Sequence, residues 1–525
     1  MKSVATLAAG SLIASIAHAQ VVQFDIAKRA TQPNRQRLSK REATTYEETI
    51  TNEKQRGGYF ATVSVGSPAQ KLTLQLDTGS SDIWVPSSSS SVCTKSAPSG
   101  GSRGGDGAES GEDEGCTLGS CKLQPGLLVD ADRVADENLH SVDSSKSTSF
   151  NVIGKNLFSI SYVDGSHSKG DYFTDDFEIG GAKLTNMTMG LGIDTDIPYG
   201  LVGVGYALNE AIVADTQKVS SAYKNLPVQM MEEGLISTNA YSLWLNDLDA
   251  STGQILFGGV DTEKYEGEMS VINVQKDSQT GAFTSFIVSM TSLTANSPSG
   301  SDSLTTRQYP IPVVLDSGTT LSYLPTELAV QVWKEVGAVW DTYTQMAFVP
   351  CGMENSKGTF EFGFAGPNGP KISVDMTELV LDIAEGSDVP KFQSGQYKGQ
   401  NICQFGIQNF TSEPFLLGDT FLRSAYVVYD LENNQIGMAK TDFNSTKSNI
   451  VAFPSKGATI PSGTVVQNQV AATGAAGGSV AQPTYAASKG FQSAAGIVPA
   501  FEWAQVAVIG ATTVFMLAGS GLFLL

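Results

Sequence analysis

Histidine, cysteine and charge are scarce in this chain of 525 residues, and each shortage narrows the classes of protein to consider. There are 3 histidines and 5 cysteines. The spacing Cys116-x4-Cys121 has no nearby histidine partner, so we expect no metal site and no cofactor. Charged residues make up only 16%, and 33 basic against 53 acidic side chains give a formal net charge of −20. That balance disfavours nucleic acid as a partner and suits cationic partners.

Helical patterns are also few. The best candidate is 326–339, which follows Pro325 and places Leu328, Val332 and Val336 on one face. Apolar alternation at 59–65, 157–162 and 424–429 predicts strands instead. The length exceeds what a single core usually supports, so we expect an all-β protein with two lobes.

A ten-residue pattern occurs twice. The first copy runs from Asp77 to Pro86 and the second from Asp316 to Pro325, each after an apolar run that predicts a buried strand, 72–76 and 311–315. A single copy could be an Asx turn after a strand. Two matched copies indicate a duplicated lobe that brings one carboxylate from each half to a common centre.

Two adjacent aspartates share one proton, because both cannot ionise cheaply. The ionised member then takes a proton from water as general base, and the protonated member polarises a scissile carbonyl. This is peptide hydrolysis without a metal or a covalent intermediate. The supporting residues are glycines that allow tight turns and hydroxyls that hold the carboxylates or link the loops: Thr78, Gly79, Ser80, Ser317, Gly318 and Thr319.

The doubled motif resembles the pepsin-like aspartic proteases, and the resemblance covers about 57–443. Segment 162–165 resembles the hairpin flap over the substrate, and 200–205 and 415–419 resemble the strands beneath the two active-site loops. The resemblance implies a bilobal all-β fold with the active site in the cleft between the lobes, and protein or peptide substrates. It implies catalytic roles for Asp77 and Asp316, and flap or substrate-binding roles for Tyr162, Asp164, Gly165 and Trp84.

Cysteine use suits a secreted protein with disulfides. The resemblance implies a disulfide between Cys351 and Cys403, and a second from Cys93 to either Cys116 or Cys121, a choice that stays open. Asn186, Asn409 and Asn444 begin N-glycosylation sequons, each to be modified only if exposed.

Both ends of the chain carry predicted targeting signals. Residues 1–19 have the pattern of a secretory signal peptide. Residues 20–41 contain paired basic residues and form the predicted propeptide of a zymogen. The two lobes follow at 42–247 and 248–444.

The C-terminal end resembles a glycosylphosphatidylinositol (GPI) anchor signal. Residues 445–493 are rich in Ser, Thr, Ala and Gly and predict an extended stalk. Small residues near Ser493, the expected attachment site, precede a spacer and an uncharged 20-residue tail, so 494–525 would be removed. A permanent transmembrane helix is the alternative. We expect a glycoprotein on the extracellular face of the cell membrane, or in the cell wall.

The loop 96–115 is Gly- and Ser-rich and acidic, which predicts a solvated insertion. Such insertions resemble those of the fungal yapsin branch, which is GPI-anchored and cuts after Lys or Arg. With Asp164, Asp194 and Asp196, the acidic loop favours substrates with basic cleavage sites. We expect a monomer, and cleavage within the loop would leave two associated chains.

A second function class is a pepsin-like surface binding or cell-wall protein that kept the fold and lost catalysis. Degenerate members of the family commonly lose one of the two catalytic aspartates (the dyad, here Asp77 and Asp316), a loop glycine or the flap tyrosine. Asp77, Asp316, Gly79, Gly318 and Tyr162 are all present, so the sequence favours an aspartic endopeptidase.

Overall fold

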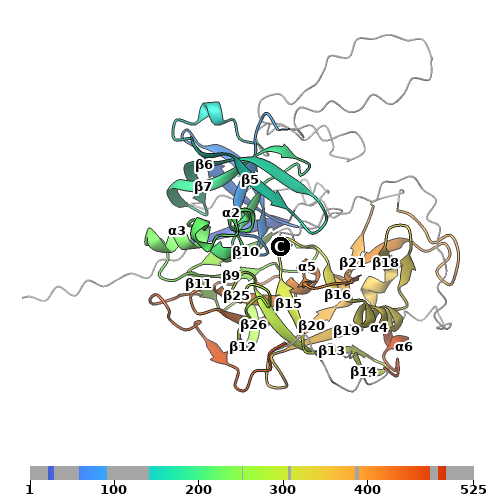
Figure 1. The fold of residues 1–525 in the computed structure, drawn as a ribbon. Coiled ribbons are helices and arrows are strands. Elements are labelled where there is room, and N and C mark those ends of the chain that lie inside the picture. The colour runs from blue at the N-terminus through green and yellow to red at the C-terminus, as the bar shows by residue number, and fades with distance from the viewer. Residues whose placement is uncertain are drawn as a thin grey trace, which may run out of the picture.

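The structure, a computed structural model, describes residues 22–28, 58–90, 141–250, 252–304, 309–384, 389–472 and 483–491. Most of these residues lie in strands, and the expected all-β architecture of two lobes is confirmed. Figure 1 shows β5, β6 and β7 in the upper part of the molecule, and β16, β18 and β19 with α4 at the lower right. The dyad strand β15 lies between these two parts.

The largest sheet has 14 strands and contains the first lobe and the floor beneath both lobes. Its order is β28 (Gly463–Val465), β12 (Tyr265–Asn273), β26 (Gln435–Thr441), β25 (Ala425–Asp430), β9 (Ala240–Trp244), β10 (Thr252–Phe257), β1 (Val22–Lys28), β2 (Tyr59–Val65), β3 (Gln70–Asp77), β8 (Leu201–Gly203), β4 (Ile83–Pro86), β7 (Ala182–Thr195), β6 (His167–Ile179) and β5 (Asn151–Ser161). Helices α2 (Ala211–Thr216) and α3 (Leu226–Glu232) accompany the first lobe.

The second lobe has its own sheet of eight strands. The order is β20 (Lys371–Asp375), β19 (Thr359–Phe364), β13 (Ile287–Ser297), β15 (Ile311–Leu315), β24 (Phe415–Leu417), β16 (Ser322–Pro325) and β23 (Ile407–Phe410), with β14 (Gly300–Leu304) paired to β13. Two small sheets join β17 (Val339–Asp341), β18 (Met346–Pro350), β22 (Ile402–Phe405) and β21 (Val380–Asp382), and β11 (Gly259–Asp261) with β27 (Ile450–Ala452).

The two copies of the motif have the same strand topology. In the first lobe β3 pairs in parallel with β8, which is antiparallel to β4. In the second lobe β15 pairs in parallel with β24, which is antiparallel to β16. Apolar side chains from both lobes, including Leu74, Val202 and Leu315, belong to one continuous core cluster. The duplication inferred from the sequence therefore extends to the strands that support each aspartate.

The one strong helix prediction is confirmed. Helix α4 (Thr326–Val336) is buried along Leu328, Val332 and Val336, and it ends where Gly337 adopts a left-handed conformation with φ of 68°. The predicted end at residue 339 was too late, because 339–341 already form β17.

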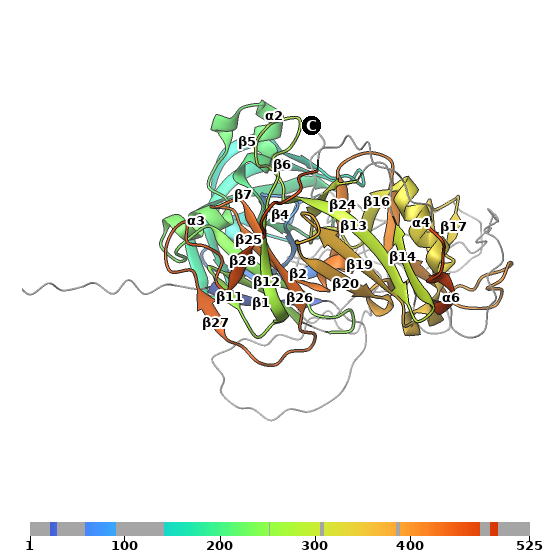
Figure 2. The same cartoon turned by 90° about the horizontal axis from the view of Figure 1, so that it is seen from below.

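The predicted stalk is wrong for the residues that the structure describes. From residue 445 the chain forms β27 and β28, and Phe453 and Ile460 are buried in an apolar cluster with Tyr426. Helix α6 (Ser488–Phe491) lies beside α4 and β14 in both views (Figures 1 and 2). A few apolar residues spaced along a small-residue segment suffice to fix it to an existing surface, although the segment has no core of its own.

Strand β1 falls within the predicted propeptide and lies between β10 and β2 in the large sheet. The predicted signal peptide 1–19, the acidic loop 96–115 with Cys93, Cys116 and Cys121, and the GPI signal 494–525 with Ser493 lie outside the described residues. Among the described residues, no helix is long and apolar enough to cross a membrane.

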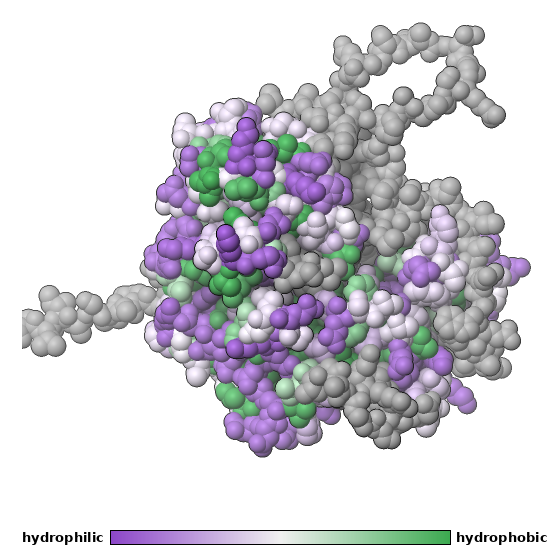
Figure 3. Space-filling model, viewed as in Figure 1, coloured by the Kyte–Doolittle hydropathy of each residue, from purple (hydrophilic) through white to green (hydrophobic). Residues whose placement is uncertain are grey.

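On the face shown in Figure 3, apolar residues gather at the top, over β5–β7. Exposed apolar residues of these strands are Val152, Ile153, Leu157 and Ile193.

Candidate active site

Each dyad aspartate ends a buried strand and is held by its own loop. The N–H of Gly79 donates to Asp77 Oδ1 at 2.8 Å, and the hydroxyl of Ser80 donates to Asp77 Oδ2. In the second loop the N–H of Gly318 donates to Asp316 Oδ1 at 2.9 Å. There the hydroxyl of Thr319 donates to Asp316 Oδ2 at 2.6 Å. The identical bonding follows from the identical spacing of glycine and hydroxyl residues after each aspartate.

Thr78 and Ser317 link the two loops reciprocally. The N–H of Thr78 donates to Ser317 Oγ at 3.2 Å, and the N–H of Ser317 donates to Thr78 Oγ1 at 2.9 Å. Each hydroxyl then donates to a backbone carbonyl of the opposite strand, Thr78 to Leu315 and Ser317 to Leu76. The four bonds are buried and fix the position of one carboxylate relative to the other.

Close approach of the loops requires glycine. A Cβ on Gly79 would lie 2.5 Å from Asp316 Oδ1, so any side chain there would displace the second carboxylate. A Cβ on Gly418 would lie 2.2 Å from the carbonyl oxygen of Thr319. These contacts place Asp316 directly against the first loop.

The electrostatics of the pair are asymmetric. Burial and the negative charge of Asp316 raise the pKa of Asp77 well above its usual range. Burial also raises the pKa of Asp316, but hydrogen bonds from Thr319 and Gly318 offset part of that effect. The bond between the two carboxyls raises the pKa of Asp77 and lowers that of Asp316. Burial and mutual repulsion therefore favour a single proton shared by the pair, and the hydrogen bonds from Thr319 and Gly318 favour the ionised form of Asp316.

The hairpin between β5 and β6 lies over the dyad. Tyr162 is buried, and its hydroxyl accepts a hydrogen bond from Trp84 Nε1 at 2.7 Å. Burial and the charge of Asp77 raise the pKa of Tyr162. Val163 at the tip packs against Val314 and Leu416 of the second lobe. The hairpin therefore bridges the two lobes beside the carboxylates.

Asp164 and Gly165 form the turn of this hairpin. Asp164 Oδ1 accepts hydrogen bonds from the N–H of Ser166 at 2.9 Å and from its hydroxyl at 2.6 Å, and Gly165 has φ of 87°. Local turn geometry thus accounts for both residues, and Oδ2 of Asp164 has neither of these bonds.

Asp194 and Asp196 lie at the end of β7, beside the start of β6 where the hairpin turn closes, and they do not contact the dyad. Both flank His167: Asp196 Oδ2 is 3.1 Å from Nδ1, and Asp194 Oδ2 is 3.8 Å from Nε2. Their side chains are 66% and 51% exposed, so they contribute a negative surface near the flap.

Sequence reasoning missed Gln75, which is buried two residues before Asp77 and thus on the same face of β3. Its Nε2 donates to the carbonyl of Gly318 at 3.2 Å, and its Oε1 has no hydrogen-bond partner. A polar residue inside the apolar run 72–76 was the available signal.

A buried acidic cluster next to the first loop was also missed. Asp82 Oδ1 accepts from the hydroxyls of Tyr223 at 2.7 Å and Tyr172 at 3.2 Å, and Oδ2 accepts from the N–H of Ala211 at 2.8 Å. Burial raises the pKa of Asp82 to about 6. Nearby Glu210 is fully buried, and burial with the charge of Asp82 raises its pKa to about 10. Nothing in the local sequence pattern marks Glu210 as buried.

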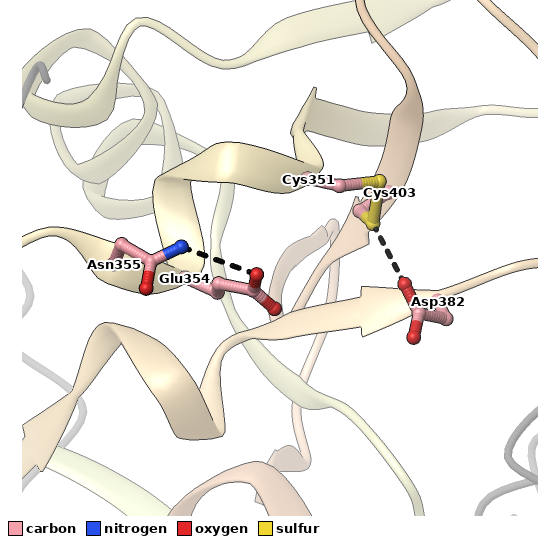
Figure 4. The surroundings of a disulfide bond; sticks show 5 residues. All are labelled: Cys351, Glu354, Asn355, Asp382 and Cys403. Carbon is pink, nitrogen blue, oxygen red and sulfur yellow. Dashed lines mark hydrogen bonds between the residues drawn. A yellow bond between two sulfur atoms is a disulfide. The ribbon is translucent and has the colours of Figure 1, made fainter.

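The disulfide between Cys351 and Cys403 is present, with Cα atoms 4.9 Å apart (Figure 4). Asp382 lies beside it, with Oδ1 3.3 Å from Cys403 Sγ. Because both sulfur atoms are in the disulfide, these three residues offer no thiolate to a metal.

The three sequons differ in exposure. Asn186 and Asn444 are exposed, whereas Asn409 is half-buried. The side-chain amide of Asn409 donates to Thr326 Oγ1 at 3.2 Å, and that of Asn444 donates to Asp247. Asn186 is therefore the most accessible of the three.

Two lobes that each contribute one loop-held aspartate to a shared proton define the class of aspartic hydrolases. The family profile described as eukaryotic aspartyl protease matches residues 58–441, and the chain belongs to this family. It is 38% identical over 454 residues to "Probable aspartic-type endopeptidase OPSB" of Trichophyton verrucosum, covering 86% of this chain and 82% of the relative. It is 36% identical to the protein of the same name from Aspergillus oryzae, with the same coverage. It is 33% identical to "Secreted aspartic protease 8" of Candida albicans, over 74% and 77% of the two chains.

Proposed function

We propose that this protein is an aspartic endopeptidase that hydrolyses peptide bonds through the Asp77/Asp316 dyad. The observation that carries the proposal is geometric: two loops with matching hydrogen bonds, linked reciprocally through Thr78 and Ser317, hold the two buried carboxyl groups against each other. Asp316 takes a proton from a water, and the water oxygen bonds to the scissile carbonyl carbon. Asp77 gives its proton to the carbonyl oxygen. The tetrahedral gem-diol then collapses: the C–N bond breaks, the leaving nitrogen takes the proton held by Asp316, and one hydroxyl of the gem-diol returns its proton to Asp77, which restores the starting state of the pair.

The test is hydrolysis of peptides at acid pH by the parent and by Asp316→Asn. The substitution removes the general base but keeps the oxygen that accepts from Gly318, so the variant should fold with an unchanged thermal transition. We expect the rate to fall by about a hundredfold to ten-thousandfold. Equal rates in parent and variant would refute the dyad mechanism. No cleavage by folded, propeptide-free parent would favour the alternative, a pepsin-like surface binding or cell-wall protein.

We further propose a preference for Lys or Arg at the cleavage site, as in the yapsin-like branch. The support is the net charge of −20, the exposed Asp194 and Asp196 near the flap, and Asp164 at its tip. A carboxylate at the tip would pair with a cationic side chain before hydrolysis. The measurement is the ratio of kcat/KM for Lys/Arg and Leu/Phe peptide libraries in the parent and in Asp164→Asn. A ratio near unity in the parent would refute the preference and leave the protease proposal standing.

We also propose that the protein is a secreted zymogen anchored outside the cell by GPI at Ser493. The support is the apolar stretch at each end of the precursor, the paired basic residues within 20–41 and the disulfide. The name of the Candida relative also indicates a secretory route. The test is phospholipase treatment of cell membranes, which should release the protein; retention after treatment would favour the cell wall or a permanent helix. Mass spectrometry of the purified protein would give its oligomeric state and any cut within 96–115.

A further inference from the structure

Residues 483–491 occupy a groove on the outer side of the second lobe. We call the surface that the segment contacts the groove: α6 contacts α4 and β13, Asp302 of β14 accepts hydrogen bonds from the segment, and Phe360 of β19 stacks on Phe491. In Figures 1 and 2 this segment lies on the side of the lobe that faces away from β5–β7. The segment therefore binds far from the dyad and takes no part in the chemistry there.

Asp302 is the polar anchor of the groove. It is 4% exposed, and its Oδ1 accepts from the N–H of Thr484 at 2.9 Å and from the Thr484 hydroxyl. Its Oδ2 accepts from the N–H of Ala487 at 2.8 Å. Although burial opposes it, these bonds hold the pKa of Asp302 below its usual range. A charged carboxylate that bonds the segment three times contributes more than an ordinary surface contact.

Glu335 of α4 is a second buried carboxyl group that interacts with Asp302, and the two would repel each other if both were ionised. Burial and the charge of Asp302 raise the pKa of Glu335 to about 8. Glu335 is therefore neutral at acid pH, and Asp302 keeps its charge for the segment.

The β13–β14 turn binds the backbone of the segment. The hydroxyl of Ser297 donates to the carbonyl of Ala487 at 2.7 Å, and that of Ser299 donates to the carbonyl of Ala486 at 2.6 Å. The N–H of Gly490 donates to Ser299 Oγ at 3.0 Å. Ser297 and Ser299 thus bond two carbonyl oxygens and one N–H of the docked segment.

An aromatic pocket receives the end of the segment. Phe491 is fully buried and stacks on Phe360, with ring centroids 5.1 Å apart. The pocket exists because residue 358 is glycine: a Cβ on Gly358 would lie 2.2 Å from the Phe491 ring. The carboxylate anchor, the serine pair and the glycine-lined pocket make a site matched to one peptide.

The docked segment contains a potential cleavage site. Lys489 is the only basic residue from 457 to 525, and the following N–H, that of Gly490, is bonded to the groove. A Cβ on Gly490 would lie 2.2 Å from Ser297 Oγ, so the backbone at the Lys489–Gly490 bond lies directly against the β13–β14 turn. A protease needs this backbone extended and free on both sides.

We propose that the second lobe carries a peptide-docking site for the chain's own segment Thr484–Phe491, and that docking shields the Lys489–Gly490 bond from hydrolysis. Undocking exposes the bond, and its hydrolysis by water removes everything after Lys489. That such a cut would free the catalytic lobes from a surface rests on the proposed C-terminal anchor; the docking and the shielding do not.

The test compares Gly358→Ala with Gly352→Ala in the full chain. The three atoms closest to a Cβ on Gly358 all belong to Phe491, so this variant blocks the pocket by expelling the segment. A Cβ on Gly352 meets no atom within 4 Å, so this variant is the matched control. Phe491→Ala removes the ring that fills the pocket and changes only the docked segment. This variant therefore tests the proposal even if Gly358→Ala folds poorly.

The readouts are amide hydrogen exchange of 483–491 and the rate of trypsin cleavage after Lys489. In the parent and in Gly352→Ala, exchange should be at least about tenfold slower than in a free peptide. In Gly358→Ala and in Phe491→Ala it should approach the free-peptide rate, and cleavage after Lys489 should accelerate by a similar factor. Cleavage after the exposed Lys456 is the internal reference and should not change.

Free-peptide exchange in the parent, or equal cleavage after Lys489 in all four proteins, would overturn the proposal. Peptide hydrolysis by the dyad is measured in the same samples. Because the groove is remote from Asp77 and Asp316, Gly358→Ala should keep the parental rate. Failure of docking with intact hydrolysis, or the reverse, therefore separates this inference from the proposed function.

Discussion

Glu210 should make the stability of the first lobe fall as the pH rises, and Glu210→Gln should remove that dependence. The Glu210 side chain is fully buried; Oε2 accepts the N–H of Tyr223 at 2.7 Å and Oε1 has no hydrogen-bond partner. Its pKa is about 10 in the folded protein against an ordinary value of 4.5. Between these values the folded chain binds this proton and the unfolded chain does not. The free energy of unfolding therefore decreases as the pH rises.

The slope follows directly from this difference of one proton. The free energy of unfolding falls by about 1.4 kcal/mol for each pH unit, so Glu210 alone should lower it by about 3 kcal/mol between pH 6 and pH 8. Asp82 contributes little in that window, because its folded pKa of about 6 means that it ionises in both states above that pH. Glutamine keeps an oxygen for the N–H of Tyr223 and cannot ionise. The variant should therefore be close to the parent at acid pH and more stable at neutral pH.

The assay is urea unfolding at several pH values between about 5 and 8, in the Asp316→Asn background to prevent self-digestion. Glu268→Gln, which changes an exposed glutamate on β12, is the control and should follow the parent curve. The difference between Glu210→Gln and the parent should widen by about 3 kcal/mol from pH 6 to pH 8. Parallel curves would refute the argument, because they would mean that Glu210 is ionised in the folded protein.

Three further substitutions test the site and its support. Ser317→Ala removes two buried hydrogen bonds between the loops and should cost about 1–3 kcal/mol of stability and lower kcat, whereas Ser317→Thr should retain both; thermal unfolding and peptide kinetics measure these effects. Glu378→Gln removes the carboxylate that is hydrogen-bonded to buried Arg423, leaves only the charge of Asp419 to offset the guanidinium, and should cost about 3–5 kcal/mol in urea unfolding, with little change in the pH profile of kcat. Trp84→Phe removes the bond to Tyr162 and should raise KM more than it lowers kcat; an unchanged KM would contradict a positioning role for Trp84.

The sequence was enough to predict the two active-site loops, because the same ten-residue motif occurs twice. Spacing alone placed a carboxylate, a glycine and a hydroxyl in each loop, and the structure gives both loops the same hydrogen bonds. Helix α4 was predictable because three apolar residues share one face and a glycine ends it. These features depend on neighbours within a few positions.

The features that could not be predicted depend on contacts between residues that are far apart in the sequence. Glu210 is buried by Tyr223 and Asp82, and Asp302 is paired with residues more than 180 positions away. Composition predicted a stalk from residue 445, because small polar residues cannot form a core of their own. They can nevertheless dock on one: Phe453, Ile460 and Phe491 each fill a site that the lobes provide. Local patterns do not reveal such sites.

The duplication does not extend to every residue of the two motifs. The two motifs match at the catalytic positions, but five residues after the aspartate the first has Asp82 and the second has Leu321. Leu321 packs in an apolar cluster with Met346 and Phe348. Asp82 instead joins a buried network with Tyr172 and Tyr223. Each lobe supplies one carboxylate to the dyad, and each lobe also buries an acid with a raised pKa, Glu210 in the first at about 10 and Glu335 in the second at about 8. We therefore expect the pH dependence that comes from Glu210 to continue above pH 8, where the contribution of Glu335 levels off.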